Sequence, residues 1–166
     1  AAGIACDTVP GISAAQGAAA ATGIPLTHRD HAAMLVFATG HLQGEEGERT
    51  VALDWAALAR PHQTVVIYMG VGTLPIICAQ LIAHGLPAST PAAMIERATL
   101  PGQRSIVGTL QTLPQLSVAY GVNPPALVMI GDTVALHARI GSSAEVLTGF
   151  PPVADTASPQ ALACTA

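Results

Sequence analysis

Short apolar runs bounded by turn residues recur along the chain and predict the strands of a sheet. The strongest is Thr64 to Met69, where β-branched and other apolar residues stand between segments rich in turn residues. Met34 to Thr39 is a second run of this kind and predicts a short buried strand. Further strands are expected at residues 91–96, 104–108 and 126–130.

Helical patterns lie between these strands. The alanine-rich stretch from Ile12 to Thr22 has high helix propensity, with Ser13 placed to cap its start and Gly23 placed to end it. Asp54 is placed to cap a short helix that follows it. This short helix is expected at residues 55–59, and further helices are expected at residues 74–84, 113–120 and 134–139.

The alternation of strands and helices predicts an α/β fold. The short connection from Glu96 to Arg104 contains Pro101-Gly102 and favours a hairpin, so we expect a mixed β-sheet flanked by helices. Residues 1–140 are expected to form one domain. Residues 141–166 are rich in Ser, Thr, Pro and Ala and have no hydrophobic period, which is typical of a disordered tail.

Composition excludes several classes of protein. The 166 residues are 51% hydrophobic and 10% charged, with a formal net charge of −4 and no lysine. Such hydrophobicity argues against intrinsic disorder, and the scattered arginines argue against nucleic-acid binding. No run of about 20 apolar residues is present to span a membrane. Because ordinary domains carry about 25% charged residues, we expect part of this surface to meet another domain or subunit.

The three cysteines, Cys6, Cys78 and Cys164, are widely separated and form no C-x-x-C pair. They favour free thiols in a reducing compartment, so we expect a cytoplasmic protein. No targeting segment is visible at the start of the sequence.

Candidate ligand contacts lie in turns rich in small residues at the predicted strand ends. Ligands of open α/β sheets bind at the carboxyl ends of strands, where small residues let a ligand approach the backbone. These turns are residues 10–14, Tyr68-Met69-Gly70 and Glu96-Arg97-Ala98. Neither a dinucleotide fingerprint nor a P-loop is present.

The densest polar cluster is residues 27–31, Thr-His-Arg-Asp-His. Arg29 could bind an anion through its planar guanidinium. His28, Asp30 and His31 could instead hold a metal, although no second group supplies further ligands. A solvated loop is the third interpretation.

Two further polar features follow the strand predicted at Met34 to Thr39. His41 follows Gly40 at the end of a predicted strand and is a candidate ligand contact. Glu45, Glu46 and Glu48 lie in a glycine-rich loop that we expect to be mobile. Catalytic carboxylates need fixed positions, so these three are interpreted as a solvated charge run.

Several unusual motifs then occur in a fixed order: V-P-G-I-S-A-A-Q-G, G-I-P-L-T-H-R-D, T-G-H-L, D-W-x-x-L-A, Y-M-G and P-P-A-L-V-M-I-G. In this respect the chain, over about residues 5–139, resembles the uroporphyrinogen-III C-methyltransferases of the tetrapyrrole methylase family. The resemblance is to the C-terminal half of those two-domain α/β enzymes. The family's G-x-G-P-G-D and G-G-D-P segments, which belong to the N-terminal half, are absent from this sequence.

The resemblance implies S-adenosylmethionine as cosubstrate, held between the two domains. The implied cofactor-binding residues are Ser13, Ala14, Met69, Ala98 and Ala126. Ser13 stands where the family has Thr, and Ala98 where it usually has Gly. The implied substrate-binding residues are Arg29 and His41, and the family's acid/base residues lie in the other half.

The implied reaction is C-methylation of uroporphyrinogen III to precorrin-2 through precorrin-1, by a homodimer. Siroheme, cobalamin and heme d1 synthesis share this step, and the sequence does not choose among them. The eight carboxylates of the substrate suit an arginine and a histidine. Two alternatives are a non-catalytic module that binds cofactor or tetrapyrrole, and a metal site at His28, Asp30 and His31 with chelatase-like chemistry.

Overall fold

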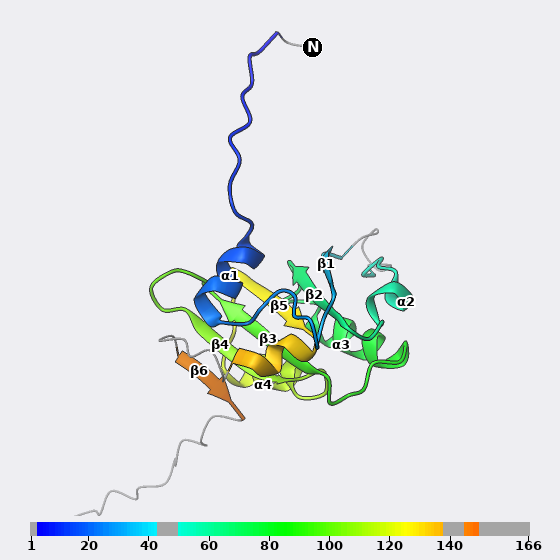
Figure 1. The fold of residues 1–166 in the computed structure, drawn as a ribbon. Helices are drawn as coiled ribbons and strands as arrows, with labels where there is room; N and C mark the ends of the chain where they lie inside the picture. The colour runs from blue at the N-terminus through cyan, green and yellow to red at the C-terminus, as the bar shows by residue number, and fades with distance from the viewer. Residues whose placement is uncertain (1–2, 43–49, 138–144, 150–166) are drawn as a thin grey trace, which may run out of the picture.

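The computed structural model describes residues 3–42, 50–137 and 145–149 (Figure 1). Its strands form a sheet in the order β1-β2-β5-β3-β4-β6. The strands are β1 (Met34–Thr39), β2 (Gln63–Tyr68), β3 (Pro91–Glu96), β4 (Arg104–Thr109), β5 (Ala126–Ile130) and β6 (Glu145–Thr148). The helices are α1 (Ala14–Thr22), α2 (Trp55–Leu58), α3 (Leu74–Ala83), α4 (Leu113–Ala119) and the 3₁₀ turn η1 (Asp132–Leu136).

The sheet is mixed, as the sequence predicts. β1 and β2 run parallel, whereas β5 is antiparallel to both of its neighbours, β2 and β3. β3 and β4 form the expected antiparallel hairpin, and β4 pairs in parallel with β6. The carboxyl ends of β1, β2 and β3 therefore meet at one edge of the sheet, together with the amino end of β5.

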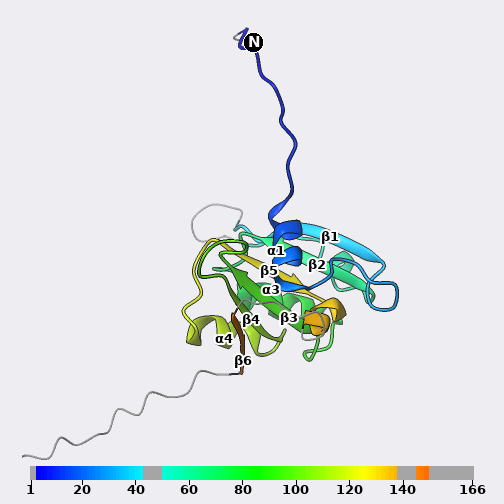
Figure 2. The same cartoon turned by 60° about the vertical axis from the view of Figure 1, so that its left-hand side comes forward.

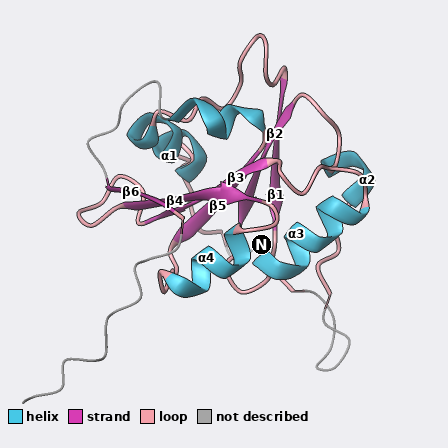
Figure 3. Cartoon of the chain, turned by 90° about the horizontal axis from the view of Figure 1, so that it is seen from below, coloured by secondary structure: helices cyan, strands magenta, loops and turns pink. Residues whose placement is uncertain are grey.

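Helices cover both faces of the sheet. Figure 3 shows α1 on one face and α3 and α4 on the other. The α1 face buries Val66, Ile95 and Met129, and the α3/α4 face buries Ile67, Met94 and Val128. This alternation of buried side chains along β2, β3 and β5 explains their almost continuous apolar sequences, because both faces of the sheet are covered.

Local sequence accounts for α1. The side chain of Ser13 accepts a hydrogen bond from the backbone N–H of Gln16, and the Gln16 side chain accepts one from the backbone N–H of Ser13. This reciprocal capping box satisfies two N–H groups at the helix start. Gly23 ends the helix at φ 71°, a left-handed conformation that favours glycine. The predicted start and end are confirmed.

Two expected elements need correction. The sequence predicts a buried β1, but Met34 is 48% exposed and Phe37 is 50% exposed, because β1 is an edge strand that pairs only with β2 among the described residues. The helix expected at 134–139 is the shorter 3₁₀ turn η1, fixed where the Thr133 hydroxyl meets that of Thr64 at 2.9 Å. Residues 138–139 lie outside the described part of the chain.

The prediction of a disordered tail over residues 141–166 needs correction at residues 145–148. Glu145–Thr148 forms β6, whose backbone pairs with Arg104–Val107 of β4. The apolar Val146 and Leu147 are the residues that distinguish this segment from its surroundings, and Leu147 packs against the core. Residues 141–144 and 150–166 lie outside the described residues.

The segment from Gly3 to Ile12 extends away from the sheet, as Figures 1 and 2 show from two directions. Its apolar side chains are largely exposed: Ile4 by 82%, Val9 by 88% and Ile12 by 79%. The segment therefore offers apolar surface to a partner. No helix in the described ranges has the length and apolar character needed to cross a membrane.

Candidate functional site

The edge where β1, β2 and β3 end contains a cavity of about 640 Å³. Its volume falls within the range of small-molecule sites, about 300–1,000 Å³. Apolar side chains predominate among its lining residues, which are Ala14, Tyr68, Met69, Val71, Gly72, Ile95, Arg97, Ala98, Thr99, Leu100, Pro124, Pro125, Ala126 and Leu127. A largely apolar cavity with few polar groups suits a ligand with a flat, apolar portion.

Three residues that line the cavity have left-handed backbone conformations, which are unusual for residues other than glycine. Met69 directly follows β2 at φ 54°, Arg97 directly follows β3 at φ 51°, and Thr99 lies two residues further on at φ 66°. Each such residue costs about 1–3 kcal/mol and persists only where its surroundings hold it, most often at functional sites. The Met69 side chain is 63% exposed at the cavity. Both turns therefore present a side chain to the ligand space at a cost in stability.

Close backbone packing shapes the turns after β1 and β2. Gly40 donates a backbone hydrogen bond to the carbonyl of Tyr68 at 2.7 Å, and its own carbonyl accepts one from the Thr73 hydroxyl at 2.7 Å. A Cβ at Gly40 would lie only 2.9 Å from the Cα of Gly70. The glycine after β1 is therefore required for this approach, which places the two turns side by side.

Tyr68 connects β2 to α1. Its phenolic oxygen accepts a hydrogen bond from the backbone N–H of Ala15 at 3.2 Å. The ring also meets Phe37 edge to face, with ring centroids 6.0 Å apart. These contacts fix the start of α1 beside β2, which brings Ala14 into the cavity wall.

Glu96, at the end of β3, holds the opposite wall. Its buried carboxylate accepts hydrogen bonds from Nε of Arg104 at 2.6 Å and from the backbone N–H of Asn123 at 2.9 Å. Nη1 of Arg104 donates to the carbonyl of Tyr120 at 3.0 Å. The carboxylate is thus fully engaged in holding the loop before β5, which carries the lining residue Pro125.

The structure brings together four of the residues predicted to bind cofactor: Ala14, Met69, Ala98 and Ala126 all line the cavity. Ser13 lies immediately before Ala14, outside the lining, and its side chain caps α1. The small-residue turns at the strand ends are therefore the useful signal in the sequence.

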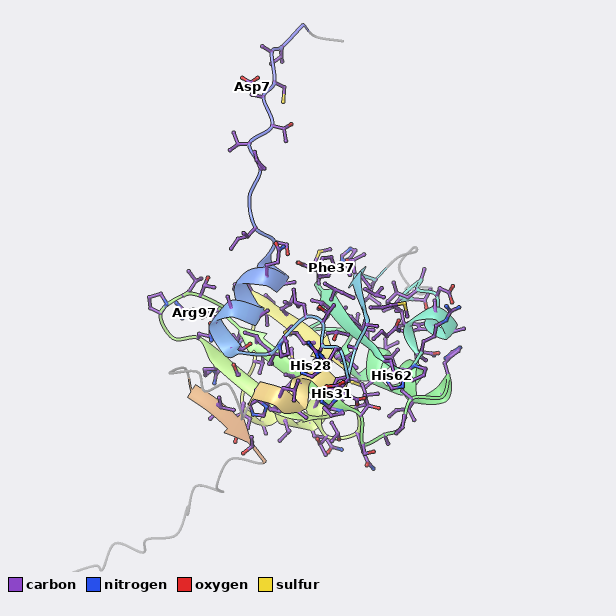
Figure 4. All side chains as sticks on the ribbon, viewed as in Figure 1. Asp7, His28, His31, Phe37, His62 and Arg97 are labelled. Carbon is purple, nitrogen blue, oxygen red and sulfur yellow. The ribbon has the colours of Figure 1, made fainter. Side chains whose placement is uncertain are left out.

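The predicted substrate residues lie apart from each other. His41 is exposed and follows Gly40 at the same edge of the sheet as the cavity. Arg29 is exposed in the turn from His28 to His31, which precedes the amino end of β1. Figure 4 shows His28 and His31 at the end of β1 away from Phe37. The described chain does not bring Arg29 to the cavity.

The histidine cluster gives the metal alternative no geometric support. His28 Nδ1 lies 3.9 Å from a carboxylate oxygen of Asp30 and also accepts a hydrogen bond from its backbone N–H at 3.2 Å. Across the ranges that the structure covers, no three His, Cys, Asp or Glu side chains converge on one point. The acidic residues Glu45, Glu46 and Glu48 lie outside the described residues.

Sequence reasoning missed Pro124, Pro125 and Leu100, which line the cavity. The prolines directly precede β5, whose amino end reaches the ligand edge only because β5 is antiparallel to β3. A prolyl pair before a strand is the signal in the sequence, but its position depends on the strand order.

Comparison with known proteins identifies the family. A family model described as Tetrapyrrole (Corrin/Porphyrin) Methylases matches residues 1–114. The chain belongs to this family. Curated relatives include the siroheme synthase of Nitrosomonas europaea, 52% identical over 132 residues, which cover 80% of this chain and 27% of that protein. The siroheme synthase of Thioalkalivibrio sulfidiphilus is 51% identical over 138 residues, which cover 83% of this chain and 27% of that protein. The chain therefore spans about a quarter of these relatives.

Solved structures confirm the α/β fold. The native uroporphyrin III C-methyl transferase of Thermus thermophilus aligns with a TM-score of 0.61 at 32% identity, covering 77% of this chain and 51% of that one. The same enzyme complexed with S-adenyl homocysteine gives a TM-score of 0.63 at 32% identity, and the alignment covers 81% of this chain and 54% of that one. A cobalt precorrin-4 methyltransferase, at 21% identity and a TM-score of 0.63, shares the fold.

Proposed function

We propose that this chain supplies one half of the cofactor and substrate cleft of a uroporphyrinogen-III C-methyltransferase. The complete protein would methylate uroporphyrinogen III to precorrin-2 through precorrin-1, and this chain would be its C-terminal half. The observation that carries the proposal is the cavity at the strand ends, lined by Ala14, Met69, Ala98 and Ala126. The Thermus thermophilus relative complexed with S-adenyl homocysteine supports it.

The cavity fits S-adenosylmethionine in size and chemistry. Its volume of about 640 Å³ accommodates a small molecule, and its apolar walls suit a planar base. Met69, Ala98 and Ala126 would hold the cofactor from three different strand ends, with Ala14 and the neighbouring Ser13 at the start of α1. S-adenosylmethionine supplies an activated methyl group on a sulfonium.

The residues of this chain would act by binding and orientation. The described cavity lining contains no Asp, Glu, His, Lys or Cys, so no carboxylate, imidazole, amine or thiol is placed there to accept a proton. Displacement at a sulfonium depends chiefly on the alignment of donor and acceptor, which a rigid apolar cleft provides. The group that removes the pyrrole proton would come from the other half of the complete protein.

We also propose that His41 and Arg29 bind carboxylates of the substrate, and the structure supports His41 more strongly than Arg29. His41 lies at the cavity's edge of the sheet, where an extended tetrapyrrole could reach it. Arg29 precedes the other end of β1, so its contact with the same substrate requires a second domain or a second copy of the chain to extend the cleft. We further propose a cytoplasmic homodimer, supported by the exposed Met34 and Phe37 on edge strand β1.

The test is methylation of uroporphyrinogen III by the complete protein with labelled S-adenosylmethionine, with precorrin-2 identified by mass spectrometry. Transfer of two methyl groups supports the proposal, and saturable cofactor binding without transfer contradicts it. The latter result would favour the second candidate, a non-catalytic module that binds cofactor or tetrapyrrole. The described lining has no carboxylate, imidazole, amine or thiol, and this observation favours the second candidate.

A further inference from the structure

Arg97 carries the only charge among the described residues that line the cavity. We propose that its guanidinium binds a carboxylate of the ligand in this cavity and so contributes to selectivity for anionic ligands. The inference rests on the proposed function, because it requires that the cavity hold the cofactor and adjoin the tetrapyrrole.

The backbone fixes Arg97 in position. Its N–H donates to the carbonyl of Pro125 at 2.9 Å, and its carbonyl accepts from the N–H of Leu100 at 2.9 Å. Both partners belong to residues that line the cavity. The left-handed conformation at φ 51° is thus held from two sides. A strained residue held in this way is preorganised, and preorganised residues are characteristic of ligand sites.

The electrostatic surroundings leave the guanidinium available. Arg104, the other arginine of the β3–β4 hairpin, is neutralised by its ion pair with Glu96. Arg97 is exposed, and no described carboxylate lies within ion-pair distance of it. A Cβ on Gly102 would lie 3.6 Å from Nη1 of Arg97, so the hairpin turn lies alongside the guanidinium without contributing an acid. Arg97 lines the apolar cavity, and a planar guanidinium is suited to bind a carboxylate through two hydrogen bonds.

Two ligands could supply that carboxylate. One is the amino-acid end of the cofactor, and the other is a side chain of the tetrapyrrole. The shared chemistry is a carboxylate beside an apolar ring system. The two sources differ in which binding reaction depends on Arg97, so they can be distinguished by experiment.

The experiment compares the complete wild-type protein with Arg97→Gln, Arg97→Lys and the control Arg60→Gln. Arg60 is also exposed but lies outside the lining of this cavity. Calorimetry measures binding of S-adenosylhomocysteine and of 5′-methylthioadenosine, which lacks the amino-acid end. Steady-state kinetics measures KM and kcat for uroporphyrinogen III.

If Arg97 binds a carboxylate of the cofactor, Arg97→Gln should weaken S-adenosylhomocysteine binding about tenfold and leave methylthioadenosine binding unchanged. If it binds a carboxylate of the tetrapyrrole, Arg97→Gln should leave binding of both adenosine ligands unchanged and raise the KM for uroporphyrinogen III about tenfold at similar kcat. In either case Arg97→Lys should recover part of the loss, and Arg60→Gln should behave as wild type.

Equal weakening of both adenosine ligands, or no change in any measurement, would overturn the role of Arg97 while leaving the proposed function intact. Wild-type protein that binds no S-adenosylhomocysteine would instead overturn the proposed function, and the inference with it.

Discussion

The hydroxyl of Tyr68, the last residue of β2, accepts a hydrogen bond from the backbone N–H of Ala15 in the first turn of α1 at 3.2 Å. This contact joins two segments 53 residues apart in the sequence. It sets the position of the small residues at the start of α1 relative to Met69, which follows Tyr68. One wall of the cavity therefore depends on this side-chain hydrogen bond.

Replacement of Tyr68 by Phe removes this acceptor and leaves a partly buried N–H unpaired. We expect a loss of about 1 kcal/mol in the free energy of unfolding and weaker binding of S-adenosylhomocysteine. Urea denaturation and calorimetry measure the two effects. Tyr120→Phe is the matched control, because the Tyr120 hydroxyl has no hydrogen bond within the described ranges. Equal effects of the two substitutions would contradict this role for Tyr68.

Gly40→Ala tests the close approach of the turns after β1 and β2. The new Cβ would lie 2.9 Å from the Cα of Gly70 and 2.9 Å from Cδ1 of Ile77. We expect a loss of about 1–3 kcal/mol in the free energy of unfolding, as for other overpacked sites. Gly72→Ala is the control, since a methyl group at that position would have no neighbour within 4 Å. A Gly40→Ala protein as stable as the control would show that the turns can separate.

Glu96→Gln tests the carboxylate that holds the loop before β5. Gln can still accept from the N–H of Asn123 but loses the charge that pairs with Arg104. We expect a loss of about 2–3 kcal/mol, below the usual cost of breaking a buried pair because Arg104 is partly exposed. Asp132→Asn, at an exposed acid, should cost far less. Denaturation midpoints measure the loss of stability in each variant. Equal losses in Glu96→Gln and Asp132→Asn would contradict the structural role of Glu96.

Burial raises the pKa of the Cys78 thiol to about 12 from its usual value of 9.0. In the variant Cys6→Ser/Cys164→Ser, Cys78 should therefore resist thiol reagents at pH 8 until the protein is unfolded. The raised pKa also implies that stability is unaffected by this group below about pH 9 and falls as pH rises from there toward 12. Rapid labelling of Cys78 in the folded protein would contradict its burial in α3.

Local signals determine how much of the fold can be predicted. The boundaries of α1 follow from Ser13, Gln16 and Gly23, which interact within the helix itself. The β3–β4 hairpin follows from Pro101-Gly102, which requires only neighbouring residues. β6 escapes prediction because a four-residue strand gains its stability from pairing with distant β4 rather than from its own sequence.

The candidate site divides in the same way. Met69 and Ala98 can be identified from small-residue turns at strand ends, because that relationship holds for most α/β sheets. The separation of Arg29 from the cavity cannot be predicted from local sequence, because it depends on which end of β1 lies at the cavity. The exposure of Phe37 likewise depends on β1 being an edge strand, which no local pattern specifies.

We propose that the cavity at the strand ends holds S-adenosylmethionine, with Met69 against it. The most direct measurement is calorimetric titration of the complete protein with S-adenosylhomocysteine, comparing wild type, Met69→Ala and Val118→Ala. Val118 is also exposed, but it lies in α4 and outside the cavity lining. We expect saturable binding by wild type and Val118→Ala, and at least fivefold weaker binding by Met69→Ala, because the substitution removes about 1 kcal/mol of apolar contact. Equal affinity of Met69→Ala and wild type would contradict this placement of the cofactor.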